Sequence, residues 1–213
     1  MYIYSEIANN ERINPMRKLL LTTAAVAGAI AGVVAGETAF GTFTDTRDGQ
    51  TYKTVKIGKQ TWMTQNLNYQ TDSGSWCYEN KADNCNKYGK LYYWNTAKTV
   101  CPTGWKLPDT ADWNKLMSTA SGDAAGKKLK SKSGWKENGN GTDVFGFSAL
   151  PSGYRYNYGD FYYAGNDGIW WTATEHGDNY AYYRNIYYGS NGVDEGYFYK
   201  GFGRSVRCIA NSP

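Results

Sequence analysis

The chain has 213 residues, of which 41% are hydrophobic, and a formal net charge of +4. This length accommodates one domain of ordinary size with extensions, or two small domains. Lys and Arg are scattered among Asp and Glu along the chain, so the charge pattern carries no nucleic-acid footprint and no nucleic-acid partner is expected.

The first 35 residues have the layout of a secretory signal. Basic Arg17 and Lys18 precede an uncharged run from Leu19 to Ala35, and small residues end that run at its predicted cleavage position. We expect residues 1–35 to be an extension and signal that is removed, and the protein to be secreted or held at the cell surface. The alternative is an uncleaved membrane anchor, for which the run is short.

Removal of this segment leaves 20 basic and 17 acidic residues, a net charge of +3. No cysteine follows the apolar run closely enough to accept a lipid. We divide the remainder into a linker over residues 36–44 and one domain over residues 45–213.

All four cysteines lie in this domain, and export implies an oxidising destination. Three pairings are compatible with the sequence. We predict Cys77 with Cys85, which closes a short polar loop, and Cys101 with Cys208, which joins the approach to a helix with the final strand. A zinc site is the weaker alternative, and no metal or other cofactor is expected.

The first predicted element is a hairpin over residues 45–63. Apolar Val55 and Ile57 alternate with Lys56, and Gly58-Lys59 is typical of a two-residue turn.

A capped helix follows in the middle of the chain. Asp109 stands at the N-cap with Asp112 three positions later, and Trp113 and Leu116 recur at the spacing of one helix face. The run ends at Gly122, and a shorter helix is predicted from Asp123 to Lys130.

From residue 131 onward, short aromatic bursts alternate with polar turns. This pattern predicts strands in FGFSALPSGYRY, GIWWTAT, YAYYRNIYYG and SVRCIA. Because strands do not alternate regularly with helices, the fold class is α+β, with an irregular antiparallel sheet, a few short helices and long loops.

The chain resembles the Fibrobacter succinogenes major paralogous domain family. The resemblance rests on segments in the family's order: DGQTYKTVKIGKQTWMTQNLNY, CYENKADNCNKYGKLYYW, CPTGWKLPDTADWNKL, GFSALPSGYR, GIWWTAT and SVRC. It implies a single domain with an exported location and a fold akin to the C-type-lectin-like and sulfatase-modifying-factor group. It implies no defined activity.

Residues for enzymatic chemistry are scarce. His176 is the single histidine, in a predicted loop, and no P-loop, dinucleotide fingerprint or HExxH is present. We therefore predict no catalytic residues and a non-enzymatic protein. An enzyme related in fold to sulfatase-modifying factors, using reactive cysteines, is the less favoured alternative.

Tyrosine is the residue in excess, with twelve between residues 154 and 199. Its flat apolar ring and polar tip suit contact with sugar rings or with another protein, although alternating tyrosines can equally cover a sheet. The candidate binding residues are Tyr156, Tyr158, Tyr162, Tyr163, Tyr180, Tyr182, Tyr183, Tyr187 and Tyr188.

We expect a module that recognises polysaccharide, with plant cell-wall polysaccharide favoured, or a cell-surface partner. The rival hypothesis is a structural or assembly protein of the cell envelope that docks through the same tyrosines.

Overall fold

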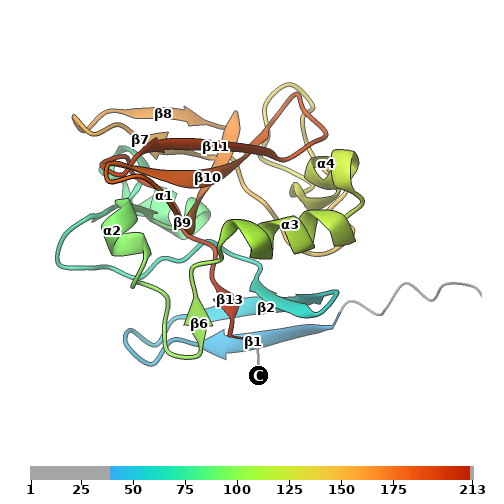
Figure 1. Cartoon of the computed structure of the whole chain (residues 1–213), viewed down its shortest axis with the longest axis horizontal. Helices are drawn as coiled ribbons and strands as arrows, with labels where there is room; N and C mark the ends of the chain where they lie inside the picture. The colour runs from blue at the N-terminus through green and yellow to red at the C-terminus, as the bar shows by residue number, and fades with distance from the viewer. Residues whose placement is uncertain (1–38, 212–213) are drawn as a thin grey trace, which may run out of the picture. The chain divides into compact units, whose positions relative to one another are not determined.

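The computed structural model describes residues 39–211, and the predicted extension, signal and cleavage position lie outside this range. The described residues form an arrangement of three sheets and a few short helices (Figure 1). This confirms a mixed helix and sheet fold with short helices and open, mainly antiparallel sheets. Among residues 39–211, no helix has the length and apolar character that crossing a membrane would require.

The first sheet has five strands in the order β1-β2-β3-β13-β6. Its strands are β1 (Phe40–Thr44), β2 (Thr51–Ile57), β3 (Gln60–Met63), β13 (Ile209–Ala210) and β6 (Trp105–Lys106). The predicted hairpin is confirmed, because Ile57 pairs with Gln60 across Gly58-Lys59 and Gly58 has a φ of 59°. Residues 40–44, expected to belong to a linker, instead form β1 and pair with β2.

The second sheet has six strands in the order β11-β10-β9-β12-β5-β4. Its strands are β11 (Asp194–Tyr199), β10 (Tyr180–Tyr187), β9 (Asp167–His176), β12 (Arg204–Ser205), β5 (Leu91–Tyr92) and β4 (Ser75–Trp76). Only the pairing of β12 with β9 is parallel among the described strand pairs. A separate ribbon pairs β7 (Ser152–Arg155) with β8 (Phe161–Ala164).

The helices are short and connect the sheets. They are η1 (Tyr78–Asn80), α1 (Ala82–Tyr88), α2 (Trp94–Ala97), α3 (Thr110–Thr119), η2 (Gly122–Ala124) and α4 (Ala125–Leu129). The capping box at the start of α3 is present, with the Asp109 carboxylate accepting from the Asp112 amide at 2.8 Å. The helix ends one turn before Gly122 because Ser121 adopts a left-handed backbone with a φ of 74°.

The core consists of two clusters of aromatic and aliphatic side chains. In the first, Trp62, Trp113 and Trp170 come from β3, α3 and β9, and the ring of Trp113 lies 5.2 Å from that of Trp62 and 5.9 Å from that of Trp170. The second cluster contains Trp94 and Trp171, both buried. Large aromatic side chains therefore make a substantial contribution to the apolar burial that stabilises the fold.

Both predicted disulfides are present. Cys77 bonds Cys85 over a separation of 8 residues, and Cys101 bonds Cys208 over a separation of 107. The predicted final strand SVRCIA is divided, because Arg204 and Ser205 pair in the six-stranded sheet whereas Ile209 and Ala210 pair in the five-stranded sheet.

Candidate functional site

The candidate tyrosines lie on two structural units and do not form one surface. None of them is fully buried. Tyr156, Tyr158, Tyr162 and Tyr163 belong to the β7–β8 ribbon and its turn, whereas Tyr180, Tyr182, Tyr183, Tyr187 and Tyr188 lie on or directly after β10.

One face of the β10–β11 pair carries a group of exposed and half-buried aromatic rings. Tyr180 lies directly across from Tyr199, and Tyr182 from Tyr197, with ring centroids 6.4 Å and 6.0 Å apart. The His176 ring stacks on Tyr197 at 3.8 Å, and its Nδ1 lies 3.1 Å from the Tyr182 hydroxyl. We call these five residues the tyrosine face.

Two members of the tyrosine face, Tyr197 and Tyr199, were counted among the twelve tyrosines but not chosen as candidates. They are 52% and 42% exposed. The alternation in DEGYFY was the available signal, since residues two apart in a strand share a face.

Tyr183 points to the opposite face of the sheet and has a structural role. Its ring lies 4.0 Å from the guanidinium carbon of Arg204, which also lies 4.9 Å from the Trp171 ring. Arg204 is buried and makes no ion pair with any residue between 39 and 211, and its burial lowers its pKa to about 10. Cation–π contacts therefore replace a carboxylate partner for this charge.

The ribbon tyrosines form a third group. Tyr156 packs against Phe202 at 4.5 Å and against Tyr158 at 5.3 Å, and Tyr158 is 83% exposed. Tyr162 and Tyr163 are exposed and both contact Tyr154, at 5.8 Å between ring centroids.

Tyr187 and Tyr188 lie at the far end of β10 from the tyrosine face. Their ring centroids are 4.3 Å apart. The pKa of the Tyr188 hydroxyl is raised mainly by a hydrogen bond with Tyr187 and to a lesser extent by one with Glu137. These two residues and the tyrosine face are therefore not parts of one binding surface.

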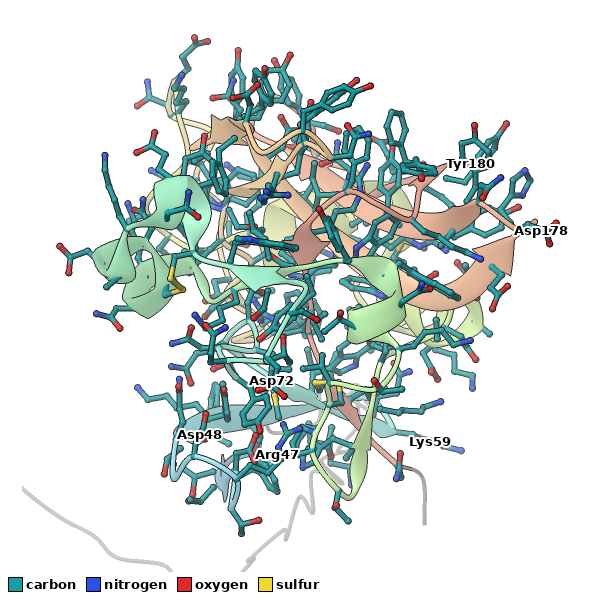
Figure 2. All side chains as sticks on the ribbon, turned by 90° about the vertical axis from the view of Figure 1, so that its left-hand side faces the viewer. Arg47, Asp48, Lys59, Asp72, Asp178 and Tyr180 are labelled. Carbon is teal, nitrogen blue, oxygen red and sulfur yellow. A yellow bond between two sulfur atoms is a disulfide. The ribbon has the colours of Figure 1, made fainter. Side chains whose placement is uncertain are left out.

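A groove of 490 Å³ adjoins the tyrosine face. Tyr199 belongs to both features, and the opposite wall of the groove carries Trp76 and Tyr93. Asp178, at the turn between β9 and β10, points outward near Tyr180 (Figure 2). Polar groups at the groove are supplied by Asn95, Asp178 and Asn179.

The aromatic wall of the groove is held in place by Arg155. Its guanidinium carbon lies 4.1 Å from the Trp76 ring, and its Nη1 donates to the Tyr93 hydroxyl at 3.0 Å. The rings of Trp76 and Tyr93 are themselves 4.4 Å apart. The wall is thus preorganised, so binding a ligand there would order few additional side chains.

The facing wall is fixed by Lys200. Its ammonium donates to the carbonyls of Gly177 and Asp178 at 3.2 Å and 2.9 Å, and to the Glu175 carboxylate at 3.3 Å. Lys98 pairs with the same carboxylate at 3.1 Å. Two hydrogen bonds lower the pKa of Glu175, the larger effect coming from Lys98 and the smaller from Lys200. The β9–β10 turn is consequently tied to the end of β11.

Within residues 39–211 no group of three or more His, Cys, Asp or Glu side chains is placed to hold a metal ion. The partners of His176 are tyrosines, and all four cysteines are in disulfides. The groove and the tyrosine face present aromatic rings and hydrogen-bonding groups to a ligand.

A family model described as the Fibrobacter succinogenes major domain matches residues 55–210. No curated protein and no solved structure matches the chain.

Proposed function

The chain belongs to the Fibrobacter succinogenes major domain family, and on that premise we propose that it is an exported, non-enzymatic module that binds polysaccharide through the groove and the tyrosine face. The observation that carries this proposal is the groove of 490 Å³ with Trp76, Tyr93 and Tyr199 on its walls.

The chemistry of the groove matches a neutral sugar chain. Sugar rings have apolar faces, which pack on aromatic rings, and hydroxyl rims, which exchange hydrogen bonds with amides and carboxylates. The groove supplies both through its three aromatic rings and through Asn95, Asp178 and Asn179. Tyr199 lies beside Tyr180, so a longer chain could continue from the groove onto the tyrosine face.

Plant cell-wall polysaccharide is the favoured ligand class, and a C-type-lectin-like fold is part of the same proposal. Support for the fold grouping comes from the Cys101–Cys208 bond, which joins the middle of the chain to its last strand, and from the open, mainly antiparallel sheets. Support for export comes from the two disulfides.

We expect the purified protein to be retained on insoluble cellulose or xylan. Tyr199→Ala and Asn95→Ala should each weaken binding about tenfold, since one aromatic or amide contact is worth about 1.4 kcal/mol at such a site. Both side chains are exposed, so the fold should persist, which circular dichroism would check.

Tyr158→Ala is the matched control, because Tyr158 is more exposed than Tyr199 but lies outside the groove. Equal weakening by Tyr158→Ala would argue for nonspecific aromatic adsorption. A wild-type protein that stays in the supernatant with both polymers and binds nothing on a glycan array would refute the proposal.

An envelope assembly role is the second candidate, favoured by β11. This strand ends the six-stranded sheet and exposes Tyr197, Phe198 and Tyr199. An edge strand of this kind can pair with another chain. If assembly is the function, sedimentation would show an oligomer whose size depends on protein concentration. The same protein would then show no affinity in the polysaccharide binding experiments. The pairing of all four cysteines weighs against the third candidate, a thiol-dependent enzyme.

A further inference from the structure

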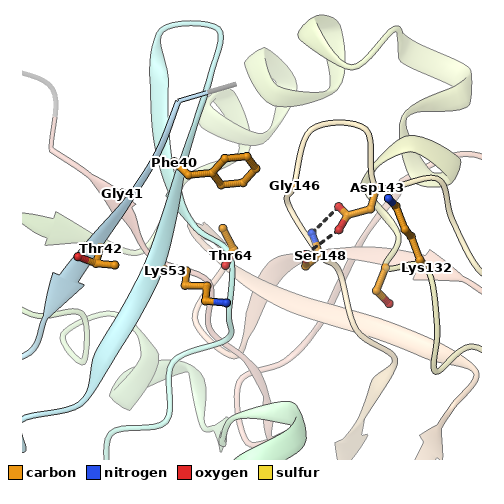
Figure 3. A pocket seen from close by; sticks show the side chains of 10 residues that line it. Phe40, Gly41, Thr42, Lys53, Thr64, Lys132, Asp143, Gly146 and Ser148 are labelled. Carbon is orange, nitrogen blue, oxygen red and sulfur yellow. Dashed lines mark hydrogen bonds between the residues drawn. The ribbon is translucent and has the colours of Figure 1, made fainter. Parts of the chain in front are cut away.

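We propose that a second cleft, remote in sequence from the groove, binds the carboxylate-bearing sugar units of an acidic polysaccharide such as a polyuronate. This basic cleft has a volume of 860 Å³ and lies between the β1–β2 strands and the segment 131–148 (Figure 3). It shares no lining residue with the groove. The inference therefore goes beyond the proposed function and does not depend on it.

The cleft has two uncommitted cations. Lys53 on β2 and Lys132 on the opposite segment are exposed, and neither forms an ion pair within residues 39–211. The lining holds one carboxylate against these two cations, that of Asp143, whose two oxygens are turned to Ser148: they accept from its amide at 2.8 Å and from its hydroxyl at 2.7 Å (Figure 3).

A third positive charge lies behind this wall. The guanidinium of Arg207 is fully buried and donates to the carbonyl of Phe147 at 2.6 Å, next to the cleft residue Ser148. Its other partners are the Asn66 side chain and further carbonyls, so none of its hydrogen bonds is to a carboxylate, and the Asp143 carboxylate acts on it only through space. Burial lowers the pKa of Arg207 to about 9, which leaves it charged at neutral pH. Buried charge is poorly screened, so it adds to the positive potential at the cleft.

An aromatic platform and hydroxyl groups accompany these charges. Phe40 is 66% exposed, and its ring lies against Gly146, where a Cβ atom would come within 2.5 Å of it. Thr42, Thr64 and Ser131 add hydroxyl groups to the lining. A small inorganic anion would use the lysines alone, whereas a uronic acid unit presents a carboxylate to them, a ring face to Phe40 and hydroxyls to the threonines.

Calorimetric titration of the purified protein tests this inference with three probes: oligogalacturonate, the neutral cello-oligosaccharide of equal length, and sodium sulfate. We expect oligogalacturonate to bind and to weaken as salt is raised, because its attraction to exposed lysines is screened. The double variant Lys53→Met/Lys132→Met should lose at least tenfold in affinity.

The matched control is Lys59→Met/Lys115→Met. These two exposed lysines face a different cleft of 520 Å³ and should leave oligogalacturonate affinity unchanged. Phe40→Ala should weaken oligogalacturonate several-fold while leaving any sulfate binding unaltered. The substituted residues in all three variants are exposed, so the buried core should stay intact, and thermal unfolding of each variant would check this.

Three results would overturn the inference: no oligogalacturonate binding, equal losses in the two lysine pairs, or sulfate binding of the same strength with no effect of Phe40→Ala. Tyr199→Ala separates the two proposals. If Tyr199→Ala loses neutral glucan binding and keeps oligogalacturonate binding, the two sites are separate. A wild type that binds oligogalacturonate but no neutral glucan contradicts only the groove proposal, and one that binds neutral glucan but no oligogalacturonate contradicts only the basic-cleft proposal.

Discussion

Lys130 illustrates at the residue scale how this fold accommodates isolated charge. Its side chain is 1% exposed, and its ammonium donates to the carbonyls of Tyr188, Ser190 and Tyr187 at 2.8, 2.9 and 3.3 Å. No carboxylate contacts it. The pKa of Lys130 is lowered from 10.5 to about 8, mainly by burial and to a lesser extent by repulsion from Lys127. One buried cation thus holds the turn that links β10 to β11.

This environment predicts a specific pH dependence of stability. Between pH 8 and pH 10.5 the unfolded chain retains the Lys130 proton more strongly than the folded chain, so the fold gains stability as pH rises through this window. Relative to Lys130→Met, the free energy of unfolding of the wild type should increase by about 2 kcal/mol from about pH 7.5 to about pH 9.5.

Urea denaturation of both proteins at the two pH values measures this difference. Lys128→Met is the control, because Lys128 lies on helix α4 two residues before Lys130, and its difference from the wild type should stay constant with pH. A constant difference for Lys130→Met as well would show that the ammonium is not destabilised by burial.

Sequence patterns predicted some residue roles well and others poorly. Cysteine pairing was predictable because one short polar loop and one long connection accounted for all four thiols. The internal positions of Lys130, Arg204 and Arg207 were not predictable, because Lys and Arg are normally exposed and only tertiary packing supplies the carbonyls and rings that receive them.

At the scale of elements, helix α3 is defined by local sequence. The Asp109 and Asp112 side chains satisfy amides of the first turn reciprocally. The helix then places Trp113 in the core and carries Asn114, whose side-chain oxygen accepts from Arg184 of β10 at 2.7 Å. The cap therefore contributes to the attachment of the helix to the six-stranded sheet.

Loss of this cap should have a measurable effect on stability. We expect Asp109→Ala to lower the free energy of unfolding by about 1 to 2 kcal/mol, because it leaves a first-turn amide without its acceptor. Lys115→Ala, at an exposed position of the same helix, should change it by less than about 0.5 kcal/mol. Thermal unfolding of the three proteins compares the two changes, and equal effects would mean that the cap adds nothing specific.

Strands were less predictable than this helix. The hairpin of β2 and β3 was found because alternation and turn residues agreed. Strands β4, β5, β6, β12 and β13 are each two residues long, too short to carry a period-two pattern. All of them except β4 also pair with a strand more than 100 residues away in the sequence. Strand β10 is longer, and its neighbours Tyr182 and Tyr183 must face opposite sides of the sheet, but only the packing of Tyr183 on Arg204 shows which side is interior.

For the whole molecule, the two disulfides differ in what they constrain. The Cys101–Cys208 bond spans 107 residues and enters the second core cluster, whereas Cys77–Cys85 spans 8 residues and ends within helix α1. On the chain-entropy model, the long loop restricts the unfolded chain more than the short one.

We therefore expect Cys101→Ser/Cys208→Ser to lower the free energy of unfolding by about 5 kcal/mol, and Cys77→Ser/Cys85→Ser by about 2 to 3 kcal/mol. Chemical denaturation of the two double variants under non-reducing conditions measures both values. The reverse order would indicate that strain or residual structure in the unfolded chain outweighs loop length.

The division of the final segment between two sheets has a consequence for biogenesis. β12 lies between β9 and β5, and β13 lies between β3 and β6, so residues 204–210 supply an interior strand to each sheet. A nascent chain that lacks them would leave both sheets open, with strand edges exposed to other polypeptides. Maturation of the domain must accordingly be delayed until synthesis has passed residue 210, a period in which chaperone protection would matter most.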